Sequence, residues 1–282
     1  MPLVQVDGAQ LNYRIDDFTD PWSDKSKLKT VVMHHAAHRG LETFTPWVPT
    51  LSRHYQVMRF DTRGVGGSSA PPEPFKATFK HLVDDSISVL EQLKLKNVHW
   101  VGTQSGGVVG LIIAATRPDL IGTLTVCNSP FKYSGPFKSK LAGVDGLSPG
   151  DALRKLGYWE WRHRTFGSSV DEEHSDPRMM NWVKDVQSRV PIHILASQMD
   201  DGAKADISAL LKDVKCPTLF MNGDRGHVVS SEDVFFMAKE VKNSRVQIFP
   251  GLGDSIHLMI GEKCARAVLD FLTEMDADPK AS

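Results

Sequence analysis

The stretch that decides the fold covers residues 98–107, which read Val98-His99-Trp100-Val101-Gly102-Thr103-Gln104-Ser105-Gly106-Gly107. An apolar run enters a turn bounded by glycines, and a run of small and apolar residues typical of a packed helix follows it. A strand that passes through a tight turn directly into a helix exposes the side chain at the apex of the turn. That apex is Gln104, and an amide cannot be activated as a serine hydroxyl can. The stretch therefore predicts a strand–turn–helix unit whose apex lacks a nucleophile.

Short apolar runs recur along the chain and are typical of buried parallel strands, which read as continuous hydrophobic segments. We expect strands over residues 11–15, 30–34, 55–60, 98–101, 124–127, 218–222 and 245–249. Between them, the patterns favour helices over residues 80–94, 108–116 and 264–275. This alternation predicts an α/β protein with an open, mostly parallel central sheet flanked by helices on both faces.

One long segment, residues 131–212, interrupts the alternation with helical patterns, scattered Gly and Pro, and many aromatic residues. Such an insertion late in the sheet predicts a helical cap over the carboxyl ends of the strands, where open α/β folds bind ligands. We therefore expect an α/β core made of residues 1–130 and 213–282, and a cap or lid made of residues 131–212.

The composition argues against several classes of protein. Charge is balanced, with 33 basic and 34 acidic side chains, and no basic block suggests a nucleic-acid partner. The start has no secretory-signal pattern, and no window approaches the ~20 apolar residues of a membrane span. Three widely spaced cysteines make a disulfide framework unlikely to be the source of stability, so we expect a cytoplasmic, reducing environment.

Four segments, in order, carry a resemblance to a known family. Residues 31–35 resemble a strand that ends in His-Gly before an oxyanion loop, and residues 59–68 resemble the turn D-x-R-G-x-G-x-S. Residues 102–107 resemble the G-x-S-x-G nucleophile elbow, and residues 250–257 resemble the P-G-x-G-H loop with the catalytic histidine. On these segments the chain resembles the α/β-hydrolase superfamily, in particular 3-oxoadipate enol-lactonases and related esterases and C–C hydrolases. The resemblance implies the α/β-hydrolase fold over nearly the whole chain.

The chain departs from the family pattern at every catalytic position. Gln104 stands at the nucleophile, Gly226 at the acid and Asp254 at the histidine. His35 stands where the family has the glycine of His-Gly. The resemblance thus implies the fold together with a degenerate catalytic triad.

A shifted register is the alternative to a lost triad. Ser105 would be the nucleophile if the elbow moved by one residue, and His257, three positions past the expected histidine, would be its base. The distance to Pro118, which ends the following helix, favours Gln104 as the apex. Two shifts are needed to restore a triad, so the sequence favours the unshifted register and leaves the other open.

Other groups at the same positions support acid–base chemistry. The family's oxyanion hole uses backbone N–H groups, which correspond here to Ser105 and Ala36 and are independent of the side chains. Asp254, desolvated under a cap, would have a raised pKa and act as a general base, unless it is only the N-cap of the next helix. Gln104 would position a substrate carboxylate or amide, unless it merely fills the turn.

A cluster of histidines follows the predicted strand at residues 30–34. We interpret His34 as mainly structural, and we expect His35 at the mouth of the pocket as an acid–base partner or carboxylate binder. His38 is a further candidate for substrate binding, and Arg39 would supply positive charge for an anionic substrate. The spacing matches no standard metal signature, so we assign no metal ligands.

The aromatic residues of the insertion include Trp159 and Trp182, which either contact an apolar ligand or form the insertion's own core. Together these observations predict an enzyme that acts on a small carbonyl compound, an ester, lactone or C–C bond substrate, by non-serine acid–base chemistry. The alternatives are a serine hydrolase with Ser105 and His257, and an inactive ligand-binding protein. No motif requires a cofactor, we expect no partner beyond the small molecule, and the family resemblance is compatible with a homodimer.

Overall fold

Eight strands form one sheet in the computed structural model, which describes residues 2–132, 145–166, 171, 173 and 175–277. From one edge to the other they are β1 (Leu3–Val6), β2 (Ala9–Asp16), β4 (Gln56–Phe60), β3 (Thr30–His34), β5 (Val98–Thr103), β6 (Ile121–Cys127), β7 (Thr218–Gly223) and β8 (Ser244–Phe249). The strands from β4 to β8 pair in parallel, whereas β1 and β2 are antiparallel to their neighbours. The predicted, mostly parallel sheet is confirmed.

The strand order places a ligand site at one end of the sheet. The chain passes from β3 outward to β4 and then returns to β5 on the other side of β3. Such a switch point leaves a crevice at the carboxyl ends of the two central strands. The loops after β3 and β5, which hold the candidate residues, therefore lie side by side.

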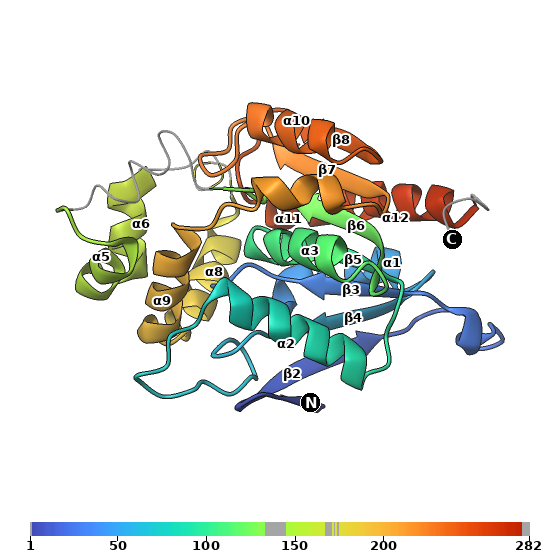
Figure 1. Cartoon of the computed structure of the whole chain (residues 1–282), viewed down its shortest axis with the longest axis horizontal. Coiled ribbons are helices and arrows are strands. Elements are labelled where there is room, and N and C mark those ends of the chain that lie inside the picture. The colour runs from blue at the N-terminus through green and yellow to red at the C-terminus, as the bar shows by residue number, and fades with distance from the viewer. Residues whose placement is uncertain (1, 133–144, 167–170, 172, 174, 278–282) are drawn as a thin grey trace.

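Helices cover both faces of the sheet, as Figure 1 shows. α2 (Phe79–Gln92), α3 (Ser105–Thr116) and α10 (Ser231–Glu240) pack on one face, and α1 (Val48–Leu51) and α12 (Gly261–Ala277) pack on the other. Short 3-10 helices η1 (Lys25–Lys27), η2 (Leu41–Phe44) and η3 (Ser208–Asp213) and the short helix α11 (Ile256–Met259) complete the connections.

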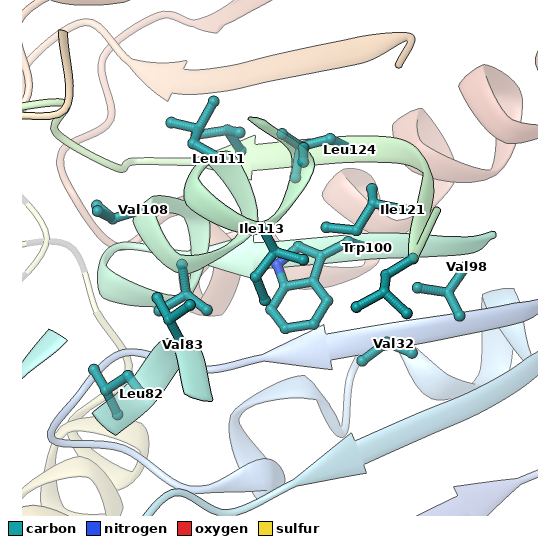
Figure 2. Packing of buried hydrophobic residues seen from close by; sticks show 14 of the residues in the cluster. Val32, Leu82, Val83, Val98, Trp100, Val108, Leu111, Ile113, Ile121 and Leu124 are labelled. Carbon is teal, nitrogen blue, oxygen red and sulfur yellow. The ribbon is translucent and has the colours of Figure 1, made fainter. Parts of the chain in front are cut away.

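Strand β5 contributes to the cores on both faces, because successive side chains of a strand point to opposite sides. Trp100 belongs to the core under α3, and Val101 belongs to the core under α12. Figure 2 shows the Trp100 indole with Ile113 of α3 on one side and Val32 of β3 on the other. Its Nε1 donates a hydrogen bond to the Gly106 carbonyl at 3.1 Å, which fixes the turn to the strand.

The predicted elements differ from the observed ones mainly at their ends. Strand β3 has the predicted bounds, and the other six predicted strands are present with ends displaced by up to three residues. The edge strand β1 is additional: only Val4 and Val6 are buried in it, so it lacks the continuous apolar run that marks the central strands. Helix α3 begins at Ser105, three residues before its predicted start, because its first turn is made of serine and glycine.

Within the described residues, four α-helices lie between β6 and β7, namely α5 (Pro149–Leu156), α6 (Tyr158–Phe166), α8 (Pro177–Ser188) and α9 (Ile192–Gly202). We call them the insert helices. In Figure 1 they lie at the end of the sheet where β3 and β4 finish. Three of them, α5, α6 and α9, share a third apolar cluster that includes Leu153, Trp161 and Leu195. The separation of a cap at residues 131 and 212 stays a prediction, and residues 133–144 of that segment lie outside the described part of the chain.

No helix within the described residues is both long enough and apolar enough to cross a membrane.

Candidate active site

Gln104 occupies the apex of the turn between β5 and α3. Its backbone has φ 51° and ψ −116°, a conformation that L-residues rarely adopt and that functional turns tolerate. Glycines on both sides allow the turn: a Cβ on Gly102 would lie 2.2 Å from the Gly106 oxygen, and one on Gly106 would lie 2.1 Å from the His34 oxygen. The apex of this turn is therefore residue 104 and not residue 105.

Ser105 is the first residue of α3 and follows the apex. Its N–H has no carbonyl one turn earlier within the helix, because the first N–H groups of a helix have no intrahelical partner. Its hydroxyl is buried without a hydrogen-bond partner among the described residues. Ser105 thus places a helix-start N–H beside the pocket, and no imidazole of the described residues bonds its Oγ.

His257 does not form the shifted triad in this structure. It is fully buried in α11, where its carbonyl accepts a hydrogen bond from Trp47 Nε1 at 2.9 Å. Neither ring nitrogen has a partner within the described part of the chain, and burial next to Arg39 holds the pKa of His257 well below its usual value. The residue does not line the pocket described below.

The side chains of His34 and His35 both contact neighbouring parts of the protein. His34 Nδ1 contacts the His35 carbonyl at 2.9 Å, and its ring packs edge-on against Phe60. Burial lowers the pKa of His34 to about 3, so the ring is neutral. His35 Nδ1 donates to the Ala36 carbonyl at 2.6 Å, and its Nε2 accepts the N–H of Thr62 at 3.2 Å.

The expectation that His35 lies at the pocket mouth is wrong. Its side chain is fully buried, and desolvation lowers its pKa. A side chain larger than glycine at this position turns inward and binds the neighbouring loop instead of facing a ligand. Ala36 is also buried and does not line the pocket, although the next residue, Ala37, does.

Asp254 lies in the loop between β8 and α11. Its carboxylate accepts hydrogen bonds from the N–H groups of His227 at 2.7 Å and Val228 at 3.2 Å. Burial raises the pKa of Asp254 to about 6 in spite of these two donors. The N-cap of α11 is Ser255, so Asp254 is not the helix cap that the sequence also allowed.

Gly226 leaves room for the Asp254 carboxylate. A Cβ at residue 226 would lie 2.5 Å from Asp254 Oδ1 and 2.9 Å from the Val229 carbonyl oxygen. The replacements at residues 226 and 254 are therefore linked in space. The carboxylate of Asp254 lies against residue 226, which corresponds to the catalytic acid in the α/β-hydrolase pattern.

Asp171, a buried residue between α6 and α8, holds the same loop from the side of the insert helices. It accepts the N–H groups of Gly253 at 3.0 Å and Ser255 at 2.9 Å, the two residues that flank Asp254. Its negative charge further raises the pKa of Asp254. Sequence reasoning missed Asp171, because nothing in the sequence distinguishes it from the adjacent Glu172 and Glu173.

A pocket of about 1060 Å³, including the part open to solvent, lies between the sheet end and the insert helices. Five predicted site residues line it: His38, Arg39, Gln104, Ser105 and Asp254. Six others do not: His34, His35, Ala36, Trp159, Trp182 and His257. Gln104 Nε2 lies 3.4 Å from the Asp254 carbonyl oxygen, so the loops of β5 and β8 meet at the floor of this pocket.

Gln198 of α9 is a pocket residue that sequence reasoning missed. It lines the pocket, and both of its amide atoms are buried without a partner in the described ranges. An isolated glutamine in an amphipathic helix carries no sequence signal that distinguishes it from a surface residue. Only the packing of α9 over the sheet reveals it.

His38 and Arg39 bring nitrogen donors to the same pocket. The His38 ring lies against Tyr158 at 5.3 Å between centroids, and burial beside Arg39 and Arg162 holds the pKa of His38 well below its usual value. Arg39 is only 9 % exposed, and burial lowers its pKa to about 10, so it remains a cation at neutral pH. Among the described residues no group of three or more His, Cys, Asp or Glu is arranged to hold a metal ion.

Comparison with known proteins agrees with the fold described above. Over 272 residues the chain is 23 % identical to the human protein named serine hydrolase BPHL, covering 95 % of this chain and 85 % of that one. It is 24 % identical to 3-oxoadipate enol-lactonase 1 of Acinetobacter baylyi, over 76 % of each chain. The crystal structure of the enol-lactonase from Burkholderia xenovorans superposes with a TM-score of 0.76 at 23 % identity, over 96 % of this chain and 100 % of that chain. The family model for the alpha/beta hydrolase fold matches residues 29–259, and the chain therefore belongs to the α/β-hydrolase fold family.

Proposed function

We propose that this member of a hydrolase family acts on a small carbonyl compound, an ester, lactone or C–C bond substrate, with Asp254 as general base and without a serine nucleophile. The observation that carries the proposal is the pair formed by Gln104 and Asp254. An amide occupies the apex of the elbow, and a partly buried carboxylate with a pKa of about 6 lines the same pocket.

The surroundings of Asp254 suit a base that works near neutral pH. A general base is most effective when its pKa lies close to the working pH, and burial has raised this carboxyl group into that range. The N–H groups of His227 and Val228 hold the carboxylate in one orientation. Asp254 would take a proton either from a carbon next to the substrate carbonyl or from an attacking water molecule.

The negative charge that develops on the carbonyl oxygen needs donors. The N–H of Ser105 at the start of α3 is one, and the loop after β3, at Ala36 and Ala37, is the place for a second. A preorganised backbone donor contributes about 3 kcal/mol to such a transition state. The amide of Gln104 would hold the substrate carbonyl group between these donors and Asp254.

The serine hydrolase alternative has weaker support. Ser105 Oγ and both His257 ring nitrogens lack hydrogen-bond partners in the described chain, and His257 is outside the pocket. The name of one relative, 3-oxoadipate enol-lactonase 1, favours a lactone substrate, which remains within the proposal, whereas the name of another, serine hydrolase BPHL, favours the alternative.

A substrate panel tests the proposal. Short acyl esters, five- and six-membered lactones, and β-keto acids would be incubated in D₂O and followed by NMR, which detects both hydrolysis and α-proton exchange. The wild-type protein is expected to act on at least one class, Ser105→Ala is expected to retain activity, and Asp254→Asn is expected to lose it. Loss with Ser105→Ala and retention with Asp254→Asn would overturn the proposal, and binding without turnover of any class would favour the inactive ligand-binding alternative.

Asp171→Asn is expected to shift the pH dependence of that activity. Activity requires Asp254 to be deprotonated, so the rate should rise with pH through the pKa of about 6. Removing the charge of Asp171 removes one cause of the raised pKa, so the midpoint should move to lower pH. The measurement is the pH–rate profile of both proteins, and an unchanged midpoint would contradict the electrostatic role of Asp171.

A further inference from the structure

A second cavity of about 350 Å³ adjoins the main pocket, and we call it the inner chamber. The two cavities share Arg39, Arg162, Asp171 and Ser255 as walls. The remaining walls of the inner chamber are mostly apolar and flexible side chains from α8 and α11, namely Met179, Met180, Val183, Leu258 and Met259. Arg39 therefore borders both the main pocket and this mostly apolar space.

Three side chains around this chamber have buried polar atoms that bind nothing in the described residues. They are Arg39, through Nε and Nη1, Gln187, through both amide atoms, and Trp159, through Nε1. Arg39 is 9 % exposed and Gln187 is 3 % exposed, so solvent does not satisfy them. Buried polar groups in native proteins nearly always have partners, so this group indicates a ligand that supplies them.

The chemistry of these unpartnered atoms indicates which chemical group would bind them. Guanidinium and indole nitrogens only donate hydrogen bonds, and the Gln187 amide can add two further donors. The matching group is therefore an acceptor with several lone pairs. A carboxylate fits, because its charged oxygens accept strong hydrogen bonds from guanidinium nitrogens and its several lone pairs can serve more than one donor.

The charges around the chamber favour an anion as well. Arg39 is a buried cation in its wall, and the only described acidic wall residue is Asp171. The Asp171 carboxylate is engaged by the N–H groups of Gly253 and Ser255. Arg39 thus has two nitrogens without partners and no carboxylate hydrogen-bonded to it.

We infer that the inner chamber is a carboxylate-binding subsite, in which Arg39, Gln187 and Trp159 hold the carboxylate of a molecule whose apolar part contacts the methionine-rich wall. This inference rests on the proposed function only in identifying that molecule as the substrate. A substrate that fills both cavities has a carboxylate at the Arg39 end and its reacting carbonyl group near Asp254.

The test is calorimetric titration of the full chain with 4-phenylbutyrate, and with 4-phenylbutan-1-ol as the uncharged analogue. We expect saturable binding of the acid, with the alcohol bound at least about tenfold more weakly. Arg39→Met is expected to weaken binding of the acid by about 10- to 100-fold, since the hydrogen-bonded charge is lost while an unbranched apolar stem remains. Arg245→Met is the matched control, because Arg245 is exposed and paired with Glu274 away from both cavities, and it should bind as the wild type does.

Other results would overturn the inference. They are equal affinity for acid and alcohol, unchanged affinity in Arg39→Met, or no saturable binding of the acid, which would mean that water alone satisfies these donors. If Arg39→Met does not fold, Gln187→Leu and Trp159→Phe provide the same comparison, each with a several-fold loss expected. Asp254→Asn separates the two proposals, because it should keep the carboxylate affinity while losing turnover; retained turnover would reject the proposed function and leave the subsite intact.

Discussion

Asp254→Asn is expected to lower turnover by about 100- to 10,000-fold, the usual contribution of a general base. The substitution keeps the shape of the side chain and removes its ability to accept a proton. The measurement is the initial rate on the substrate identified by the panel, at pH 8, where the wild-type carboxyl group is ionised. A loss smaller than about tenfold would contradict the role of Asp254 as the base.

The same variant is expected to be more stable than the wild type at high pH. The pKa of Asp254 is raised from 3.8 to about 6 in the folded protein, so the folded state holds the proton more tightly than the unfolded chain does. Stability from this group is therefore largest at low pH, falls as the pH rises from about 4 to about 6, and is level above that. The shift corresponds to about 3 kcal/mol at most, since one pKa unit is about 1.4 kcal/mol.

Urea unfolding at pH 4 and at pH 8 would measure this difference. Asn at 254 resembles the protonated carboxyl group, so the two proteins should have similar free energies of unfolding at pH 4. At pH 8 the variant should gain up to about 3 kcal/mol. A variant less stable than the wild type at pH 8 would show that the hydrogen bonds from His227 and Val228 outweigh the cost of burying the charge.

Gly226→Ala provides a separate check of the same carboxylate. The added Cβ would lie 2.5 Å from Asp254 Oδ1, so the carboxylate has to move while the residue itself stays in place. We therefore expect Gly226→Ala to lose activity in the way that Asp254→Asn does. Full activity in Gly226→Ala would show that the position of the carboxylate is unimportant.

Gly106→Ala is expected to have the largest effect on stability, a loss of about 4 kcal/mol or failure to fold. The new Cβ would lie 2.1 Å from the backbone oxygen of His34, and a backbone atom cannot turn away as a side chain can. The change would separate β3 from the elbow at the point where both support the pocket. Urea unfolding, or the yield of folded protein, is the measurement.

Gly146→Ala is the control for Gly106→Ala. Gly146 has φ +68° and nothing within 4 Å of the added Cβ, so only backbone strain of about 1–2 kcal/mol is expected. Equal losses in the two variants would show that the close approach of the elbow to His34 contributes nothing.

The fold was predictable because its central strands are buried on both faces. The continuous apolar runs at residues 30–34 and 98–101 mark such strands directly, and the glycine-bounded turn at residue 104 fixes the connection to the following helix. The edge strand β1 was not predictable, because half of its side chains face solvent and the strand has only four residues. Local pattern therefore identifies the interior of this sheet better than its edges.

The residues of the candidate site were predictable only where the sequence shows both the type of residue and the loop that carries it. Gln104 and Asp254 follow from the register of two loops, and the structure brings both to one pocket. His35 could not be placed, because whether a side chain turns inward depends on partners such as the N–H of Thr62, which come from another loop. Asp171 belongs to the insert helices, and its contact with the loop around Asp254 depends on tertiary packing alone.

The most direct test of the central claim is to treat the protein with a fluorophosphonate, map any adduct by peptide mass spectrometry, and measure the turnover of the same sample. These reagents modify activated serines. We expect no adduct on Ser105 and undiminished turnover, because the apex of the elbow is Gln104 and no imidazole in the described part of the chain hydrogen-bonds the hydroxyl of Ser105. A stoichiometric adduct on Ser105 with loss of turnover would contradict it, and would assign the chemistry to a serine nucleophile next to the apex.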